Sequence, residues 1–565
     1  MNHIIDTRII PFEKFYYNRL FHDYIFDFPA IRKYFHYDYR RLSDYVDRIS
    51  DIRKTYDERL RNDITGILFE MNNRLGASKK TLENITDFSK KDSVVVIGGQ
   101  QPGLFTGPAF IIYKIITVIR LSSFIQETTG TRTIPCFWNA SDDSNIEQAN
   151  CLGLITDKHI KMKVDTSALK ENTRLSKASL LAPDFFNIID DIISMLPRAY
   201  QGEEIASFLK KSVNDLVETV DRNGEIGFAD LFSVIILRLF SQWGLVIIDP
   251  SNAAFKKSGY NLLEWDIKEH KVINKNIRER GEKLKKEGYH AQLTTNEKVL
   301  DFFKDIGDIR GKIKILPGGD FEIMGRKYKE YSLLSEAFKD TSSISWNVVL
   351  RPIVQDILFP VAATICGPGE ISYFAQLGGV YEHCGIKMPV IYPRFSATLV
   401  EDKIAGLMEK TGINTAHLGK NIEDVLKSVF KKDKPFDIES LVRDLGKNVT
   451  DKIKDLEDEL KEGKVDAGSS FDRIKRNLDR EISVLSKKLY SGFKRQNQMM
   501  NKNIEKIYLH LFPGNSLQEK TVNIFYYLNK YGMDMIKSLH NAYTPLEHGH
   551  NFIYLKGDKK DGKRQ

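Results

Sequence analysis

The stretch that decides the fold is residues 94–108, which read Val-Val-Val-Ile-Gly-Gly-Gln-Gln-Pro-Gly-Leu-Phe-Thr-Gly-Pro. Four β-branched residues end at two glycines, a pattern typical of a buried strand that meets a tight turn. Beyond the turn, isoleucines recur at helical spacing, at Ile111, Ile112, Ile115, Ile116 and Ile119. The order strand, glycine loop, helix predicts one unit of an α/β fold.

Four more short apolar stretches have the features of buried strands. They are residues 134–138, 245–248, 361–366 and 390–392. They lead into residues suited to bind a ligand, namely Asp142 with Asp143, Asp249, the turn from Gly367 to Glu370, and Arg394. Apolar strands that alternate with helices predict a parallel α/β sheet. Ligands of such sheets bind beyond the carboxyl ends of the strands, so these residues predict a site.

The rest of the chain divides around this sheet. We expect a helical N-terminal segment packed on the core (1–90), the α/β core itself (91–400) with insertions at about 155–230 and 255–345, a helical coiled-coil domain (401–515), and a C-terminal helix with a basic tail (516–565). In the second insertion, Pro317–Asp320 has the composition of a hairpin turn. No strand pattern is visible beyond about residue 400.

Apolar residues in the third part follow an a/d pattern on both sides of a Gly-Ser break at 467–470. They are Leu445, Val449, Ile453, Leu456, Leu460, Phe471, Ile474, Leu478, Ile482, Leu485 and Leu489. The pattern predicts a helical hairpin. It serves either burial against the rest of the chain or self-association, and we expect a homodimer.

Composition bounds the function. The 565 residues are 42% hydrophobic and 28% charged, which is typical of a globular, multidomain chain. No apolar run is long enough to span a membrane and no secretory signal is visible, so we expect a cytoplasmic protein. The four cysteines form no disulfide framework or zinc pattern. Part of the net charge of +8 lies in the C-terminal tail, which we interpret as a solvated segment because it lacks the interleaved aromatics of a nucleic-acid-binding stripe. An excess of cations would suit anionic small substrates equally well.

The glycine loop is a candidate anion site. Its glycines allow close approach of a ligand, Pro108 suits the first helical position, and a helix start attracts phosphate or carboxylate. Lys114, one or two turns on, would neutralise a bound phosphate. The loop matches neither the dinucleotide fingerprint nor the P-loop, so an ordinary tight turn and a solvated lysine remain the alternative.

Two other stretches carry candidate chemistry. Asp142 and Asp143 would orient an amine, accept a proton or hold Mg²⁺, and the alternative is a cap for the next helix. Arg351 precedes a proline, which predicts an extended backbone and a guanidinium held ready for an anion. Its alternative is a structural ion pair with Asp356 or Glu370.

Several of these stretches together resemble the BshC family of bacillithiol biosynthesis. The similar segments are residues 98–108, 135–150, 351–355, 367–376 and 389–401, with Tyr527–Gly532 near the C-terminus. The resemblance implies a Rossmann-like core akin to class I synthetases and nucleotidylyltransferases, with connecting insertions and a dimerising C-terminal coiled coil. It implies a ligase that joins the carboxyl of L-cysteine to the amine of glucosaminyl-malate. Because a free carboxylate must be activated before an amine can attack it, ATP and Mg²⁺ are candidate cofactors.

On the matched segments, the candidate catalytic residues are Asp142, Asp143 and Arg351. The candidate substrate- or nucleotide-binding residues are Gly98, Gly99, Gln100, Gln101, Gly103, Thr106, Gly107, Lys114, Ser144, Gln355, Gly367, Gly369, Glu370, Tyr373, Gln376 and Arg394. No residue is assigned as a metal ligand. We expect Gly103, Asp143, Arg351 and Gly369 to converge on one pocket.

One position departs from the family. After the second strand the family commonly has Glu-Asp-His-Asp, whereas this chain has Asp142-Asp143-Ser144-Asn145. Serine does not titrate near neutral pH, so Ser144 cannot replace histidine as an acid or base. Two alternatives therefore stay open: a divergent nucleotidyl or acyl transferase acting on another small amine, and a non-catalytic nucleotide-binding dimeric paralogue.

Overall fold

The computed structural model describes residues 3–15, 17–197, 201–219, 224–417, 422–426, 438–463, 470–496 and 498–556. The chain forms two compact units, one of residues 1–399 and 516–556 and one built from residues 400–515. Three residues of the expected Gly-Ser break at 467–470, namely 467–469, and residues 557–565 of the basic tail lie outside the described residues.

A parallel five-stranded sheet forms the centre of the first unit. Its strand order is β15 (Val390–Pro393), β14 (Val361–Cys366), β2 (Val94–Gln100), β3 (Thr133–Asn139) and β8 (Val246–Ile248). All neighbouring strands pair in parallel, as the sequence predicts. Every residue of β3 and β14 is buried, so both faces of the sheet are covered. The strand order reverses direction between β2 and β14, which places the loops after these two strands at the switch point.

Helix α6 (Phe110–Thr129) packs closely on β2. A Cβ added at Gly98 would lie 2.7 Å from Cγ2 of Val118, so only glycine allows this approach. The helix begins at Phe110, and the expectation that Pro108 is its first residue is wrong. Gly107 precedes it at φ +66°, a conformation that favours glycine and lets the chain turn into the helix.

The first insertion lies between β3 and β8. It contains the short α7 (Ile146–Ala149) and the hairpin of β4 (Cys151–Ile155) with β5 (His159–Lys163). It also contains the antiparallel pair β6 (Ser179–Leu181) and β7 (Glu225–Gly227), with α8 (Ala182–Met195) and α9 (Gly202–Thr219) between them in the chain, and then α10 (Phe228–Leu239).

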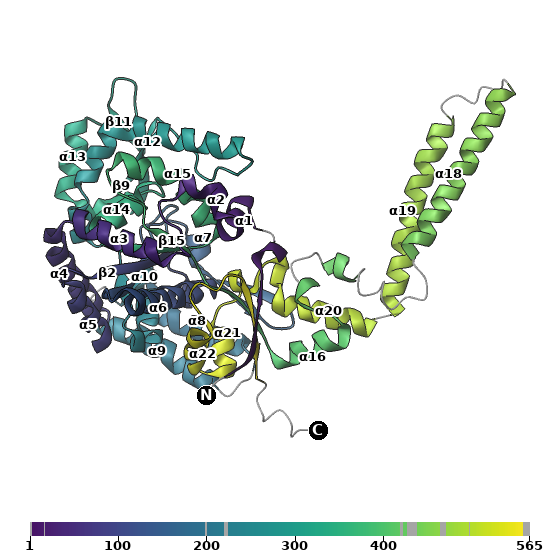
Figure 1. Ribbon diagram of the computed structural model, residues 1–565. Helices are drawn as coiled ribbons and strands as arrows, with labels where there is room; N and C mark the ends of the chain where they lie inside the picture. Colours follow the sequence, from purple (N-terminus) through teal and green to yellow (C-terminus); the bar gives the residue numbers. More distant parts are fainter. Residues whose placement is uncertain are drawn as a thin grey trace. The chain divides into compact units, whose positions relative to one another are not determined.

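The second insertion lies between β8 and β14 and carries a second sheet. Helices α11 (Ala253–Ser258), α12 (Asn261–Lys286) and α13 (Glu330–Lys339) accompany five antiparallel strands. The strand order is β12 (Arg326–Tyr328), β11 (Phe321–Ile323), β10 (Ile309–Ile315), β9 (Val299–Ile306) and β13 (Ile344–Trp346). The expected turn forms between β10 and β11, where the Leu316 amide donates to the Asp320 carbonyl at 2.7 Å. After β13 come α14 (Leu350–Leu358) and α15 (Pro368–His383), and α15 lies beside α12 (Figure 1).

The N-terminal ninety residues are largely helical, as expected, with α1 (Arg19–Phe26), α2 (Phe28–Ile31), α3 (Leu42–Thr55), α4 (Glu58–Arg74) and α5 (Lys79–Phe88). They also contain β1 (Ile4–Ile10), which joins a three-stranded sheet in the order β1, β17 (His550–Leu555), β16 (Ser396–Val400). The expectation that strands end near residue 400 is therefore wrong. Two short helices, α21 (Phe525–Tyr531) and α22 (Asp534–Ala542), precede β17.

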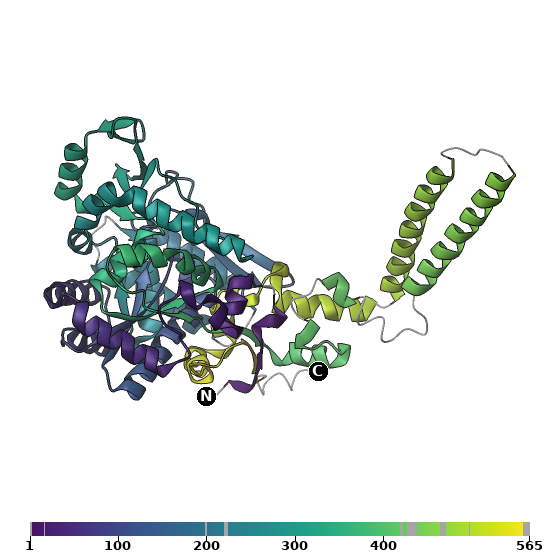
Figure 2. The same cartoon turned by 45° about the horizontal axis from the view of Figure 1, so that its top comes forward.

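The second unit is helical. Helices α16 (Asp402–Thr411) and α20 (Gln498–Leu511) pack on each other, and α18 (Ile438–Glu462) and α19 (Ser470–Gln496) lie side by side as the predicted hairpin (Figure 2). A Cβ added at Gly446 would lie 2.8 Å from Cδ1 of Ile482, so the two helices are in close contact. Among the described residues, none of the helices combines the length and apolar character needed to cross a membrane.

Candidate functional site

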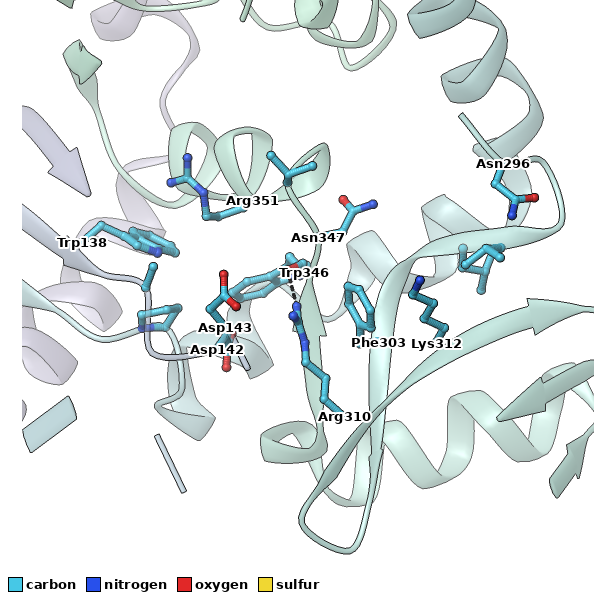
Figure 3. Close-up of a pocket in the computed structure, with 15 residues that line it drawn as sticks. Trp138, Asp142, Asp143, Asn296, Phe303, Arg310, Lys312, Trp346, Asn347 and Arg351 are labelled. Atoms are coloured by element: carbon cyan, nitrogen blue, oxygen red, sulfur yellow. Dashed lines mark hydrogen bonds between the residues drawn. The ribbon is translucent and has the colours of Figure 1, made fainter. Parts of the chain in front are cut away.

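A cavity of about 450 Å³ opens beyond the carboxyl end of β3. One side is formed by the parallel-sheet region, through Trp138, Asp143 and Arg351, and the other by the second insertion, through Phe303, Arg310, Lys312, Trp346 and Asn347 (Figure 3). The three predicted catalytic residues, Asp142, Asp143 and Arg351, therefore line one space. Gly103 and Gly369, which we expected to join them, are not among the residues that line it.

Three cationic side chains line this cavity. Arg310 is fixed by its contacts: Nε donates to Oγ of Ser345 at 2.8 Å, and a terminal nitrogen donates to the Trp346 carbonyl at 3.0 Å. Its guanidinium lies 3.7 Å from the centroid of the Phe303 ring. Burial lowers the pKa of Arg310 from its ordinary value, which still leaves the group charged at neutral pH. With Lys312 and Arg351, it makes the cavity suitable for an anion.

Asp142 is an anchor and not a free carboxylate. Its Oδ1 accepts hydrogen bonds from Arg174 and from Lys256, each at 2.8 Å. Burial acts to raise the pKa of Asp142, but the two cations outweigh it and hold the pKa below its ordinary value. Burial also lowers the pKa of Lys256 to about 8, against the attraction of Asp142. Arg174 further pairs with Asp305 at 2.5 Å, so the network ties the loop after β3 to the second insertion. The predicted catalytic role of Asp142 does not suit this arrangement.

Asp143 is the carboxylate that remains accessible. It is half-buried, and its Oδ1 accepts the Asn145 amide at 3.0 Å, while its main-chain carbonyl accepts the Leu175 amide at 2.8 Å. No lysine or arginine of the described residues lies within ion-pair distance of it. Asp143 thus forms a local turn before α7, close to the expected capping role, and keeps a carboxylate oxygen for a ligand.

Arg351 is helical, and the prediction of an extended backbone is wrong. It is the second residue of α14, where the proline that follows falls in the first turn and its missing N–H costs nothing. Its guanidinium donates to the Tyr373 hydroxyl at 3.1 Å and to Oε1 of Gln355 at 3.4 Å. Burial acts to lower the pKa of Arg351, but Tyr373 and Glu370 outweigh it and raise the pKa. Arg351 does not form the ion pair with Asp356 or Glu370 that was its alternative role. Tyr373 and Gln355 are both buried and position the arginine.

Lys114 joins the two glycine loops. Its Nζ donates to Oε2 of Glu370 at 2.6 Å, to the Gly99 carbonyl at 2.7 Å and to Oε1 of Gln100 at 3.2 Å. The same oxygen of Glu370 accepts the Gly367 amide at 2.7 Å, which caps α15. The side chain of Lys114 is only 1% exposed. Neither a phosphate-neutralising nor a solvated lysine fits this burial, so both expectations for Lys114 are corrected: it is a structural cation.

Other predicted binding residues are held by protein partners. Arg394 donates to Glu519 at 2.6 Å with both side chains buried, and Gln376 bonds the main chain of Leu293. Thr106 is fully buried. Nδ2 of Asn523 donates at 2.7 Å to the carbonyls of Phe105 and Gly107, which fixes the glycine loop from the C-terminal segment.

One residue of the glycine loop, Gly99, lies near the cavity. A Cβ at Gly99 would be 3.1 Å from Cβ of Trp138, so this glycine lets the cavity's aromatic wall pack against β2. Gln101 and Gly103 are half-buried, and Gly369 is exposed. The described residues contain no group of three or more His, Cys, Asp or Glu side chains arranged to hold a metal ion.

Ser144 lies in a second cavity, of about 840 Å³, that adjoins the first. The residues that line it run from Asp143 to Glu147 and from Lys163 to Asn172. Asp143 lines both cavities.

Sequence reasoning missed four cations of this region: Arg174, Lys256, Arg310 and Lys312. All four lie in the insertions or at their edges, with no motif around them. The one signal in the sequence that could have indicated them was the length of the insertions. These insertions connect strands whose carboxyl ends form the site.

Comparisons with known proteins agree with this architecture. The family model for the N-terminal Rossmann-like domain of the bacillithiol biosynthesis protein BshC matches residues 5–395, and that for its C-terminal coiled-coil domain matches residues 397–555. Similar curated proteins carry the name "Putative cysteine ligase BshC". They include those of Salinibacter ruber, 28% identical over 94% of this chain and 96% of the relative; Natranaerobius thermophilus, 27% identical over 94% and 96%; and a Bacillus cereus strain, 26% identical over 90% and 93%.

Proposed function

Because this chain belongs to the BshC family of bacillithiol biosynthesis, we propose that it is a cysteine ligase that joins the carboxyl of L-cysteine to the amine of glucosaminyl-malate. The observation that carries the proposal is the first cavity, where one accessible carboxylate, Asp143, faces the cations Arg310, Lys312 and Arg351. An ammonium and an activated carboxylate need groups of these two kinds held close together.

The roles follow from charge. Asp143 receives the amine of the acceptor and takes its proton as nitrogen attacks the carbonyl carbon of cysteine. The C–N bond forms while the bond from that carbon to the activating group breaks. Arg310, Lys312 and Arg351 stabilise the negative charge that develops on the carbonyl oxygen and the leaving group.

We propose ATP as the source of activation, since a free carboxylate does not react with an amine. The three cations of the cavity would hold its phosphates, and Mg²⁺ would enter with them, because Mg²⁺ commonly binds through one carboxylate and substrate phosphates. ATP supplies the leaving group, and the residues of this chain supply position and charge.

We also propose that the protein is a homodimer through the α18–α19 hairpin. Leucines of the a/d pattern remain between 37% and 50% exposed in the single chain, namely Leu445, Leu456, Leu485 and Leu489. A seam of this kind is buried by a second copy in coiled coils.

The test is product formation. Purified protein is incubated with L-cysteine, glucosaminyl-malate, ATP and Mg²⁺, and bacillithiol is measured by mass spectrometry beside a related enzyme of known activity. Asp143→Asn should lower the rate by about 10²-fold or more, whereas Asp157→Asn, at an exposed carboxylate between β4 and β5 that lines neither cavity, should have little effect. Absence of product from the wild type, with product from the related enzyme, contradicts the proposal. Omission of ATP tests the cofactor separately.

The non-catalytic alternative draws on Ser144, which stands where the family has histidine. Ser144→His separates the two functions: appearance of activity in an inactive wild type identifies a protein that has lost its reaction. A panel of other small amines, with ATP turnover as the readout, tests the transferase alternative.

A further inference from the structure

The second cavity has a different character from the first. Its lining residues are all polar except Ile146, Val164 and Leu169. They include hydroxyl and amide side chains as well as lysines and carboxylates. The first cavity, by contrast, has Trp138, Phe303 and Trp346 among its walls. The second cavity is therefore suited to a ligand that carries many hydroxyl groups, and the first to a compact anion.

Main-chain hydrogen bonds hold together the segments around the two cavities. The Leu175 amide donates to the Asp143 carbonyl at 2.8 Å, and the Ser176 amide donates to the Ser141 carbonyl at 2.9 Å. At the other end, the Arg310 amide donates to the Asn172 carbonyl at 3.1 Å. A residue of the second cavity, Asn172, is thus bonded directly to a residue of the first.

The floor of the second cavity is fixed as well. Asn150 is fully buried, and its Nδ2 donates to Oγ1 of Thr166 at 2.9 Å and to the Val164 carbonyl at 3.2 Å. Lys163 forms an ion pair with Glu147 at 2.5 Å across the lining. These contacts hold the two lining segments in place without a ligand, which is the property of a preformed site.

Asp143 lines both cavities, and this position limits the ways in which two substrates can be placed for reaction beside it. A molecule whose ammonium contacts Asp143 must extend its body into one cavity, and the reaction partner of that ammonium must lie in the other. The acyl donor is small, and its activated form carries negative charge. The first cavity, with its cations and aromatic walls, suits a ligand of this kind. The acceptor carries sugar hydroxyls and two carboxylates, which Ser144, Asn172 and Lys170 can bond.

We propose that the second cavity is the acceptor subsite: it binds the sugar and malyl groups of an amino sugar, with the ammonium on Asp143 at the border with the first cavity. The assignment of the acceptor rests on the proposed ligase function. Ser144, where the family has histidine, then contacts the acceptor and influences which acceptor is bound.

Binding of each substrate alone tests the proposal without requiring a reaction. Isothermal titration calorimetry measures glucosaminyl-malate and L-cysteine separately against three tryptophan variants. Ser144→Trp fills the second cavity, Val348→Trp fills the first, and Ser194→Trp, on an exposed position of α8, is the control. We expect Ser144→Trp to weaken glucosaminyl-malate binding by about tenfold or more and to leave cysteine binding unchanged. Val348→Trp should weaken cysteine binding.

A second variant guards against misfolding. Asn172 has φ +64°, so Asn172→Gly removes the side chain in a conformation that glycine adopts freely. It should weaken glucosaminyl-malate binding by about threefold to tenfold. N-acetylation of the acceptor removes the ammonium and should cost the wild type about tenfold in affinity. Asp143→Asn should abolish that difference between the two acceptors.

The outcomes separate this proposal from the ligase function. Equal loss of both substrates in Ser144→Trp, or no loss of glucosaminyl-malate in both Ser144→Trp and Asn172→Gly, overturns the acceptor subsite, even if product forms. If the variants bind the substrates as expected but no product forms, the acceptor subsite is supported and the ligation reaction is rejected. No binding of glucosaminyl-malate to the wild type rejects both.

Discussion

Replacing Lys114 by methionine should destabilise the first unit by about 3 kcal/mol. The side chain is 1% exposed and donates three hydrogen bonds, the shortest of them 2.6 Å to Glu370. Breaking a buried ion pair by removing one partner costs about 3–5 kcal/mol, because the other charge is left without compensation. Glu370 is 26% exposed and keeps the hydrogen bond from the Gly367 amide, so we take the lower end of that range.

Tryptophan fluorescence during urea unfolding measures this change selectively. All four tryptophans of the chain lie in the first unit, so the helical hairpin does not contribute to the signal. Lys90→Met is the matched control: Lys90 also forms a 2.6 Å ion pair, with Asp87, but it is 60% exposed. Its loss should cost about 0.5 kcal/mol.

A double-mutant cycle tests whether the pair itself carries the effect. Glu370→Gln keeps a side-chain oxygen for the Gly367 amide and removes the charge. Combined with Lys114→Met, it should cost about 1–2 kcal/mol less than the sum of the two single changes. If Lys114→Met costs no more than Lys90→Met and the two changes simply add, the structural role is refuted and the phosphate-binding prediction returns.

Three more predictions follow from the described contacts. Burial raises the pKa of Asp356 to about 6. The Asp356 carboxyl therefore binds a proton more tightly in the folded chain than in the unfolded chain. This contribution to the free energy of unfolding is lost as pH rises from about 4 to about 6. Asp356→Asn should gain about 2–3 kcal/mol relative to the wild type over that interval by urea unfolding, and a difference independent of pH would reject the argument. Arg351→Lys, which cannot make both bonds of the guanidinium, should lower kcat/KM for ligation by about 10²-fold with little change in unfolding; a loss below about threefold would exclude a role in catalysis. Serine at Leu445, Leu456 and Leu485 together should convert dimer to monomer in sedimentation velocity without altering tryptophan unfolding, and a persisting dimer would mean that another surface holds the copies together.

The central sheet was predictable because its strands are locally marked. β14 has the bounds that the sequence indicates, since an apolar run meets Gly367-Pro368 and neither residue continues the strand. β17 was not predictable in the same way. Its partner β1 lies at the opposite end of the sequence, and the pairing of His550 with Ile10 is a tertiary contact that no local pattern records.

The candidate site was partly predictable. Asp143 and Arg351 follow directly from the loop after β3 and from the motif before β14. Lys114 and Arg394 were predicted as binding residues, but each pairs with a carboxylate, Glu370 and Glu519, that lies 256 and 125 residues away along the chain. From sequence alone, a lysine outside any motif, such as Lys256, cannot be distinguished from a solvated lysine, because its burial is a property of the folded chain.

The pairing of β1 with β17 also has a consequence for synthesis of the chain. The middle strand of that three-stranded sheet is translated after the entire second unit, so β1 and β16 leave the ribosome long before the strand that bridges them. Until then each presents an unpaired edge, which makes the nascent polypeptide vulnerable to aggregation. A stop codon placed before residue 550 would remove only a short segment and yet leave that edge permanently open.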